Sequence, residues 1–414
     1  MRQDPVHTEA ARQADAGSEA ERTDGLGLWF ADFHIHIGRA MGRPVKMAAA
    51  PSLTLDRLLH HARAVKGLDI VTVIDGVCTG VLAELTRLVQ TGELTEQPGG
   101  GLRHKNGLVV FPGAEVEIAG PAGGAAHFGA WFPTLAAAAD FHAWLATVQG
   151  NPALSSQRAR VEATALQREV AARQGLFVVH HAFTPHKGLY GCCVRSMADM
   201  LEPQLVDAVE LGLSADSEMA DGLSELAPFT FLTNSDAHSL PKVAREYNAL
   251  RLAAPTFAEV AKALRREAGR RVAANYGLLP ELGKYHRSVC AACGAPWSPG
   301  QTVCRCGSRQ AVGGVRERLR ELSDCDPPRH PPHRPPYIRQ VPLAFVPGIG
   351  EKWYARLLAA FGTEMDVLHR TSRDALATVC GEALAERIDL ARRGLLTVEP
   401  GGGGVYGRLR LAQA

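Results

Sequence analysis

The stretch Ala31-Asp32-Phe33-His34-Ile35-His36-Ile37 places two histidines two residues apart within an apolar, strand-like run. Successive side chains of a strand point to opposite faces, so His34 and His36 present their imidazoles on the same side. A single histidine in such a run is usually a core residue, and this pair alone is weak evidence for a site. The pair becomes informative because other strand-like runs carry similar residues.

Several apolar runs end in, or contain, a residue that can bind a metal. These residues are Asp75 in DIVTVID, Glu115 in VFPGAEVEI, His127 in AHFGAWF, His180 and His181 in LFVVHH, and Asp236 and His238 in FTFLTNSDAH. The runs alternate with helical patterns such as LDRLLHHARAV, which predicts an α/β fold with a parallel sheet, most simply a barrel. The carboxyl ends of barrel strands meet at one mouth, so we expect these residues to converge there.

Convergent histidine and carboxylate side chains without a thiolate are typical of Zn, Mn or Fe sites, and Mg is also compatible. The set is larger than one ion needs. We therefore expect a cluster of two or three ions, with Glu115 as the candidate bridging carboxylate. Clustered divalent ions suit the in-line hydrolysis of a phosphoester, because they stabilise both the attacking and the leaving oxygen.

The order HxH, D, E, H, H, DxH resembles that of the PHP phosphoesterase superfamily, which implies a distorted barrel of strands and helices with a trinuclear metal centre. The resemblance implies metal roles for His34, His36, Asp75, Glu115, His127, His181, Asp236 and His238, of which Asp236, Glu115 and His238 are the candidate catalytic residues. His181 is preferred to His180 because the family's histidine precedes a small residue and a turn, here Ala182. Two positions depart from the family: Gly76 and Met41 stand where many members carry a ligand.

Four cysteines form a second candidate metal site. Cys290 and Cys293 have the spacing C-x2-C, Cys304 and Cys306 have the spacing C-x-C, and a glycine follows each pair. This pattern indicates a zinc-ribbon-like module with one structural Zn. Four thiolates would leave no open coordination position, so this ion would stabilise the fold and would not catalyse. A redox pair or unrelated thiols are the alternatives.

The segment Val346-Pro347-Gly348-Ile349-Gly350-Glu351-Lys352 resembles a helix-hairpin-helix motif. Glycines let the backbone approach a phosphate, and the free amides at the start of the next helix point toward the anion. We therefore predict DNA contacts at Gly348, Gly350 and Lys352. The segment that follows looks like a second, degenerate hairpin that keeps Gly381. A simple turn between helices is the alternative.

Composition and charge divide the chain further. Residues 284–414 carry 19 Lys and Arg against 12 Asp and Glu, whereas the first 283 residues carry a net charge of −5. This asymmetry raises the expectation of a nucleic-acid partner. We predict a disordered polar tail (1–27), a PHP domain (28–283), a four-cysteine zinc module (284–325), a proline-rich linker (326–342) and an all-α helix-hairpin-helix domain (343–414). The sequence has neither a secretory signal nor an apolar run of membrane-spanning length, which predicts a cytoplasmic protein with reduced thiols.

The whole arrangement resembles the endonuclease Q family. The stretches that carry the resemblance include ADFHIHIGRA, HAFTPHKGLYG, FLTNSDAHSLPK, RRVAANYGLLPELGKYHR and VPLAFVPGIG. The family implies a DNA repair nuclease that cuts 5′ of a deaminated base (uracil, hypoxanthine or xanthine) or an abasic site, and the lesion base would have to be flipped out of the duplex. Candidate contacts in loops beside the metal motifs are Arg39, Lys46, Ser155, Ser156, Gln157, Arg158, His186, Lys187, Ser239 and Lys242, with Arg39 and Arg158 as the chosen DNA contacts.

Two other functions compete with this interpretation. A small-molecule phosphomonoesterase would use the same metal residues, but it would have no use for residues 284–414. A DNA-binding adaptor with an inactive PHP domain would not need the nearly complete set of ligands. The sequence shows no evident peptide for binding a replication or repair partner.

Overall fold

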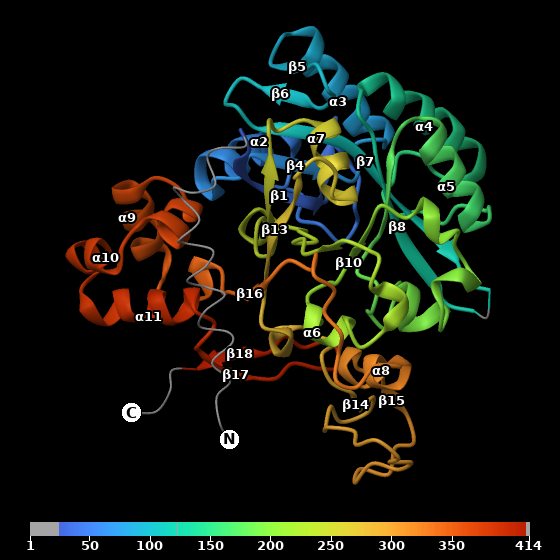
Figure 1. Ribbon diagram of the computed structural model, residues 1–414, viewed down its shortest axis with the longest axis vertical. Helices are drawn as coiled ribbons and strands as arrows, with labels where there is room; N and C mark the ends of the chain where they lie inside the picture. Colours follow the sequence, from blue (N-terminus) through green and yellow to red (C-terminus); the bar gives the residue numbers. More distant parts are fainter. Residues whose placement is uncertain (1–24, 122, 411–414) are drawn as a thin grey trace.

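The computed structural model describes residues 25–121 and 123–410 (Figure 1). Most of the expected disordered tail, residues 1–24, therefore lies outside the described residues. The first described strand, β1, begins at Gly27.

One large sheet organises the molecule. Within the described ranges it has twelve strands, ten of which follow the order β11-β10-β9-β8-β7-β4-β1-β12-β13-β16, while β5 and β6 extend it from β7. The strands are β1 (Gly27–Ile35), β4 (Ile70–Val73), β5 (Leu94–Glu96), β6 (Leu102–His104), β7 (Val109–Ala119), β8 (Ala125–Trp131), β9 (Leu176–Val179), β10 (Ala208–Glu210), β11 (Phe231–Leu232), β12 (Tyr247–Leu252), β13 (Arg271–Gly277) and β16 (Tyr337–Arg339).

The sheet is mixed, so the expected parallel sheet is wrong. β1, β4 and β7 are parallel, and so are β9, β10 and β11, but β8 is antiparallel to both of its neighbours and β12 is antiparallel to β1 and β13. The reversal at β8 has a local cause: only a short glycine-rich turn joins β7 to β8, and a connection of that length makes a hairpin, not a crossover.

The expected barrel is present only in part, as a curled half-barrel. The first half of β1 pairs with β12, whereas its end turns toward the segment after β11. There Ile35 and Ala237 form an isolated parallel bridge, and the His36 amide donates to the Ala237 carbonyl at 3.1 Å. This bridge brings the end of the HxH strand beside the DxH segment.

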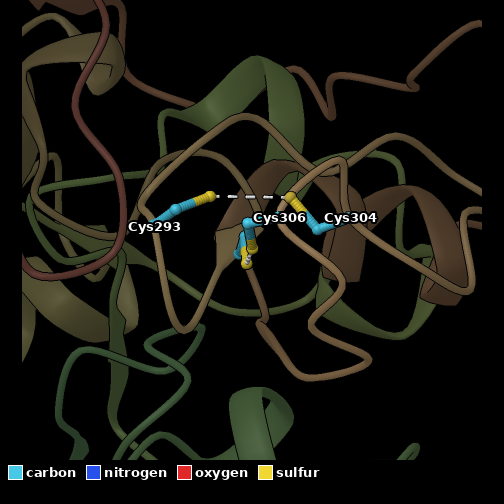
Figure 2. Close-up of side chains that lie close together, drawn as sticks. Cys293, Cys304 and Cys306 are labelled. Carbon is cyan, nitrogen blue, oxygen red and sulfur yellow. Dashed lines mark hydrogen bonds between the residues drawn. The ribbon is translucent and has the colours of Figure 1, made fainter.

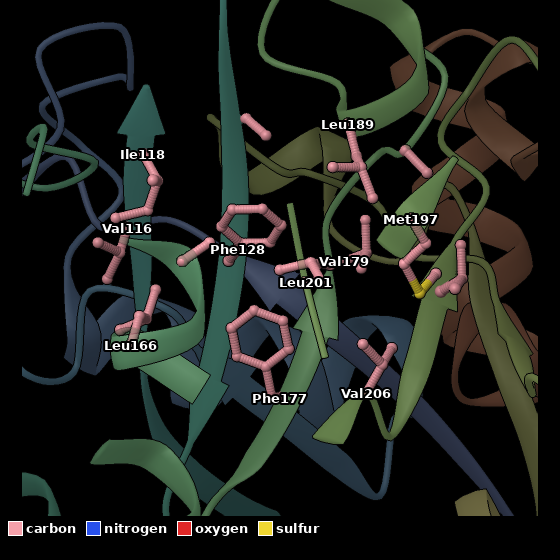
Figure 3. Close-up of a cluster of buried hydrophobic side chains, with 14 of the residues drawn as sticks. Val116, Ile118, Phe128, Leu166, Phe177, Val179, Leu189, Met197, Leu201 and Val206 are labelled. Atoms are coloured by element: carbon pink, nitrogen blue, oxygen red, sulfur yellow. The ribbon is translucent and has the colours of Figure 1, made fainter. Parts of the chain in front are cut away.

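The helices pack around the sheet and enclose its cores. Their bounds are α2 (Leu55–His60), α3 (Thr79–Gln90), α4 (Leu135–Val148), α5 (Ala163–Ala172), α6 (Ser217–Ala220), α7 (Phe257–Arg265), α8 (Val315–Leu322), α9 (Glu351–Phe361), α10 (Arg373–Cys380) and α11 (Glu382–Arg392). Figure 3 shows part of one core, in which Phe128 of β8 stacks on Phe177 of β9 and Leu166 of α5 covers the same side. β7 is buried along almost its whole length, as expected for a strand with both faces covered.

The cysteine segment forms a small module on the half-barrel domain. β14 (Val289–Cys290) pairs antiparallel with β15 (Ala311–Val312), residues 291–310 with the other cysteines lie between them, and α8 follows β15. Val315 and Leu319 of α8 are buried in the same core as β7 and β8. The module is therefore fixed to the sheet domain by its helix.

Residues 326–342, expected to be a linker, pack closely on the domain. The Arg334 guanidinium lies 3.4 Å from the centre of the Phe231 ring and pairs with the buried Asp221 at 2.7 Å. Pro335 and Pro336 directly precede β16, which pairs with β13 at the sheet edge. An edge strand tolerates flanking prolines because few of its amides need a partner.

The C-terminal segment is not all-α as expected. Helices α9, α10 and α11 surround a core of their own that includes Leu357, Leu376 and Ile388. A hairpin of β17 (Thr397–Glu399) and β18 (Arg408–Arg410) then follows. In Figure 1 these three helices lie on the opposite side of the sheet from α4 and α5. Among the described residues, none of the helices is long and apolar enough to span a membrane.

Candidate metal centre

The predicted ligands meet at the mouth of the half-barrel. A cavity of about 370 Å³ opens there, and residues from widely separated parts of the chain line it. Among the lining residues are His36, Glu115, His127, His181, Asp236 and His238. His34 lies directly beneath, completely buried, with its ring 5.4 Å from that of His36.

Glu115 of β7 occupies the middle of the cluster. Its Oε1 lies 3.3 Å from His34 Nε2, 3.1 Å from His127 Nδ1 and 3.5 Å from His181 Nε2. Its Oε2 lies 3.6 Å from His36 Nε2. One carboxylate thus faces two groups of imidazoles, the arrangement that a bridging ligand between two ions requires.

Asp236 and His238 complete the open side of the cluster. Asp236 Oδ1 lies 3.4 Å from His34 Nε2 and 3.5 Å from His36 Nε2. One ligand atom from each of His36, Asp236 and His238 falls within 4.8 Å of the others, and the same holds for Glu115, His127 and His181 and for His34, His36 and Glu115. These overlapping groups fit a cluster of ions better than one ion.

The far nitrogens of the HxH pair are held by buried carboxylates. His34 Nδ1 lies 2.9 Å from Glu210 Oε2, and His36 Nδ1 lies 3.0 Å from Asp75 Oδ1. A carboxylate behind a metal-binding histidine fixes its tautomer and ring orientation, so that Nε2 presents its lone pair to the ion. Both imidazoles are therefore oriented toward Glu115 and Asp236.

The ring nitrogens that face the cluster test whether it fits an ion. His34 Nε2, His36 Nε2 and His127 Nδ1 are buried, yet none makes a hydrogen bond to any described residue. Their contacts to Glu115 are close but have the wrong geometry for hydrogen bonding. Buried polar groups are rarely left without a partner, and a ligated cation would supply one to all three.

Charge in the cluster is strongly coupled. Burial would raise the pKa of Glu115, but His127 and Lys46 hold it well below the usual range. Burial would likewise raise the pKa of Asp236, and His34, His36 and His238 keep it low. Burial lowers the pKa of His238 to about 4. Nearby carboxylates raise the pKa of His34 and His127 against the effect of burial. Divalent metals bind ionised carboxylates and deprotonated imidazoles, so a metal ion here would compete with protons for the histidines.

Two of the candidate ligands have strained backbones. Asp236 has φ +45° and His181 has φ +27°, which is unusual for residues other than glycine. Each follows the end of a short strand of the half-barrel, β11 and β9 respectively. Strain of this kind persists where the surrounding structure holds a side chain in one functional direction.

Sequence reasoning placed some residues differently from the structure. Asp75 is not in any of the ligand groups, because its carboxylate faces His36 Nδ1 and the Ile37 amide. The sequence did not lead us to predict Glu210 or His180 as ligands, yet both lie in the cluster. Together with His34 they form a fourth group of possible metal ligands. Glu210 had a signal, since it is a lone carboxylate inside the apolar run AVELGL, much as Glu115 is inside VFPGAEVEI.

The two departures from the family pattern also have structural explanations. A Cβ at Gly76 would lie 2.9 Å from backbone atoms of Val73, Pro112 and Gly113, so no histidine fits there. Met41 is 60% exposed. Neither position supplies a ligand to the groups described above.

Several of the predicted loop residues reach the site. Lys46 Nζ lies 3.0 Å from Glu115 Oε2, Ser156 hydrogen-bonds to the same carboxylate, and Ser155 hydrogen-bonds to Asp75. Lys187 Nζ lies 2.5 Å from Glu117 Oε2. His186 and Lys242 line the cavity.

Other predicted contacts lie at its edge or beyond. Arg158 pairs with Glu117 at 2.7 Å. Arg39, Gln157 and Ser239 are not among the residues that line the cavity. Arg39 is exposed on β2 (Arg39–Ala40), which pairs with β3 (Arg43–Pro44) in a small hairpin.

A larger cavity, of about 1080 Å³, lies at the amino ends of β9 and β10. Its two lining arginines already have partners: Arg173 pairs with Asp140 at 2.6 Å and Arg265 with Asp207 at 3.0 Å. Because it lacks a convergent set of catalytic side chains, we assign the chemistry to the smaller cavity.

The four cysteines of the small module converge as predicted. Their sulfur atoms all lie within 4.8 Å of one another, with 3.5 Å between Cys293 and Cys304 and 3.6 Å between Cys290 and Cys306 (Figure 2). Tetrahedral Zn–S bonds of about 2.3 Å give S···S edges of about 3.8 Å. The residues therefore fit a structural zinc ion.

The predicted hairpin turns sharply and is open to solvent. Gly348 has φ +95°, and α9 begins directly after Gly350. Gly348, Gly350 and Lys352 are exposed, and the Arg387 guanidinium donates to the Pro347 carbonyl at 3.3 Å. The amides at the start of α9 are thus accessible at the surface.

The curled half-barrel, the histidine and carboxylate cluster and the four-cysteine module define a metal-dependent hydrolase. The comparisons with known proteins extend this assignment. The chain is 46% identical over 385 residues to the uncharacterized protein YqxK of Bacillus subtilis, which covers 92% of this chain and 99% of that protein. No family model matches the chain.

Two solved structures match almost the whole fold. One is the lesion-specific endonuclease PfuEndoQ from Pyrococcus furiosus, with 29% identity and a TM-score of 0.80 over 93% of this chain and 96% of that chain. The other is endonuclease Q in complex with a 27-mer duplex substrate with an abasic lesion at its active site, with 29% identity and a TM-score of 0.81 over 94% and 97%. The chain therefore belongs to the same family as YqxK and is a close structural match to endonuclease Q over about 93% of its length.

Proposed function

We propose that this protein is a metal-dependent repair endonuclease that hydrolyses the DNA phosphodiester bond on the 5′ side of a deaminated base (uracil, hypoxanthine or xanthine) or an abasic site. The observation that carries the proposal is the match to lesion-processing endonucleases along 93% of the chain, which includes the segments beyond the metal domain. A phosphatase of small metabolites would need only the half-barrel.

The proposed ligands of the ion cluster are His34, His36, Glu115, His127, His181, Asp236 and His238. Divalent ions bound there would supply two things: a water molecule of lowered pKa, and positive charge on the oxygens of the scissile phosphate. Asp75 and Glu210, behind the HxH pair, would fix the tautomer and the orientation of the two imidazoles.

Lys46 is the cationic side chain nearest to the cluster centre. Its ammonium lies 3.0 Å from Glu115 Oε2, and the attraction of Glu115, Asp75 and Asp236 outweighs burial and raises its pKa. We propose that Lys46 remains protonated and donates to a non-bridging oxygen of the phosphate. Such a donor would stabilise the charge that develops on the phosphate in the transition state.

The DNA itself would be held by separate parts of the chain. The distinguishing atoms of a deaminated base lie on its pairing edge, so the base would have to leave the stack to be read. We propose that the exposed hairpin at Gly348 and Gly350, with Lys352, grips the backbone through amides and charge without reading sequence. Arg39 and Arg158 are proposed as further backbone contacts.

The direct test uses four matched duplexes that differ at one position: deoxyuridine, deoxyinosine, an abasic site or the normal nucleotide. With Mg²⁺ or Mn²⁺, the protein should nick the three damaged duplexes and leave the fourth intact. Rapid release of phosphate from small monoesters, with all four duplexes uncut, would instead establish a phosphomonoesterase.

A further inference from the structure

The mouth of the metal cavity is completed by a loop from the C-terminal end of the chain. Residues 400–407 lie between β17 and β18, and Tyr406 lines the cavity together with Lys242, Arg245 and Lys284. About 290 residues separate this loop from Glu115 in sequence. The function proposed above does not use it.

The loop is fixed in place by its glycines. The amides of Gly401, Gly404 and Gly407 donate to the carbonyls of Glu281, Lys284 and Leu282 at 2.7, 2.9 and 3.0 Å. A Cβ at Gly407 would lie 2.5 Å from the Glu399 carbonyl oxygen and 2.6 Å from that of Glu281. The glycines therefore allow close backbone packing that presents the Tyr406 side chain in one position.

Tyr406 is linked to a proposed metal ligand through Arg245. Arg245 donates from Nη1 to the Tyr406 hydroxyl at 3.3 Å and from Nη2 to the Asp236 carbonyl at 3.2 Å. Arg245 Nε also donates to the Ser235 carbonyl at 2.6 Å. One side chain thus sets the position of the tyrosine ring relative to the cluster.

Three cations surround the ring. The charged groups of Lys242, Arg245 and Lys284 lie 5.9, 6.0 and 6.0 Å from its centroid. Burial would raise the pKa of Tyr406, but these cations lower it. Tyr285 extends the surface: Lys284 lies 4.9 Å from its ring, and its ring meets that of His186 edge to face at 5.4 Å.

An aromatic ring among cations, beside a site that hydrolyses phosphodiesters, matches the requirements of a nucleotide. Stacking on the ring would accept any base, because every base has a π-face. The cations would attract the flanking phosphates. Tyr406 as a whole residue is 39% exposed, so it has room for a partner. Its hydroxyl already has a donor in Arg245, which leaves the ring as the free part.

We propose that Tyr406 is a stacking platform for a nucleobase next to the scissile phosphate, and that Lys242 and Lys284 hold the adjoining phosphates. The proposal rests on the function proposed above. It assigns the glycine-rich C-terminal loop to the active site and makes Tyr406 a residue that contacts substrate.

The test compares Tyr406→Phe, Tyr406→Leu and Tyr406→Ala with Leu395→Ala, a half-exposed apolar residue of the same C-terminal segment outside the cavity. Single-turnover nicking and affinity for one lesion-containing duplex are measured, the affinity in an Asp236→Asn background. Loss of stacking to one base should reduce affinity about 10-fold to 100-fold in the Leu and Ala variants. The Phe variant and Leu395→Ala should stay within about twofold of the wild type.

Other results in these variants would overturn the proposal. Wild-type affinity in both the Leu and Ala variants would overturn the platform. If Tyr406→Phe were as weak as Tyr406→Ala, the hydroxyl and Arg245 would be responsible, and stacking would be refuted. The midpoint of urea unfolding should be the same in all four variants, and a lower midpoint in the Leu and Ala variants would overturn the proposal by tracing their loss of affinity to a structural defect. If the wild type fails to nick every damaged duplex, the proposed function itself fails.

Discussion

At the residue scale, the two nitrogens of each imidazole in the HxH pair have different partners. Nδ1 of His34 and His36 faces a buried carboxylate, and Nε2 faces the cluster. The alternation of a strand explains why both rings lie on one face. It cannot reveal Asp75 and Glu210 behind them, because those contacts join residues that are 39 and 176 positions apart.

Asp75→Asn should weaken metal binding without unfolding the protein. The amide keeps the shape of the side chain but loses the charge that orients His36, and removal of such a partner typically costs about 10-fold to 100-fold in metal affinity. The measurement is nicking rate against Mn²⁺ concentration, and excess metal should restore most of the rate. Glu93→Gln, which alters an exposed pair with Lys105, is the control and should leave the Mn²⁺ dependence unchanged. An unchanged Mn²⁺ dependence in Asp75→Asn would contradict the role.

Asp236→Asn should remove cleavage while DNA binding persists. Asp236 is the carboxylate on the open side of the cluster, and its backbone is held at φ +45°. We expect a loss of at least about 1000-fold in the nicking rate, comparable to the loss of other groups that stabilise a transition state electrostatically. Gel-shift affinity for the same duplex should change by less than about threefold. Normal cutting by this variant would show that the site lies elsewhere.

At the element scale, a buried ion pair joins the C-terminal helices to the sheet domain. Lys66 is only 1% exposed, and its Nζ lies 2.5 Å from Glu364 Oε2. The Tyr354 hydroxyl donates to the same oxygen at 2.7 Å. Neighbouring Met365 is buried in the core that includes β1 and β4. These contacts fix the helices against the half-barrel.

Glu364→Gln should destabilise the protein by about 3 kcal/mol, because it leaves the Lys66 ammonium buried without a counter-charge. Burial raises the pKa of Glu364, but Lys66 and the hydrogen bonds to Glu364 hold it below 4.5. The pair therefore stabilises fully above about pH 4.5, and this contribution is lost as the pH falls toward the lower folded value.

Urea unfolding across a range of pH checks this prediction. The variant should lose less stability than the wild type on acidification below pH 4.5. Glu386→Gln, at a half-exposed pair with Arg373, is the matched control and should change stability by less than about 1 kcal/mol. Equal acid dependence in the wild type and Glu364→Gln would contradict the assignment.

A separate prediction concerns the zinc content of the four-cysteine module. Cys304→Ser should reduce the zinc content of the purified protein by one ion per chain, because a hydroxyl is a poor ligand in a four-thiolate site. Elemental analysis after dialysis measures this. Cys192→Ser changes a half-buried cysteine outside the module and should leave the zinc content unchanged. Equal zinc in both variants would show that the four thiols do not hold the ion.

Local sequence patterns predicted the positions of the motifs better than the way the strands pair in the sheet. The positions of the HxH, DxH and cysteine pairs follow from short runs of sequence, and the structure brings them together. The reversed strand β8, the edge strand β16 inside the proline-rich segment and the C-terminal hairpin did not follow. Each depends on pairing between distant segments, for which no local pattern was strong: β16 pairs with β13 some 60 residues earlier.

At the scale of the whole molecule, the catalytic cavity and the hairpin at Gly348 belong to separate cores. The hairpin lies in the core of α9 to α11, and the cavity belongs to the half-barrel. A phosphodiesterase that acts on polymeric DNA uses such separation, because backbone contacts far from the cut add affinity without constraining the chemistry.

Lys352→Ala should weaken binding to damaged and undamaged duplexes equally. Loss of one phosphate contact should lower the slope of log affinity against log salt by about 1. Binding measured at several salt concentrations gives this slope. Lys105→Ala, an exposed lysine of the β6 turn, is the control and should leave the slope unchanged. A Lys352→Ala protein with the wild-type slope would remove the hairpin from the DNA interface.

The most direct test of lesion-specific cleavage is to map the cut in a duplex that is labelled at both ends and carries one abasic site. We predict a single nick immediately 5′ of the lesion, with a 3′-hydroxyl and a 5′-phosphate, in the wild type and not in Asp236→Asn. Three results would contradict a lesion-specific endonuclease that cuts on the 5′ side. They are cuts scattered along the duplex, cuts 3′ of the lesion, and an intact duplex under conditions where the metal site is loaded.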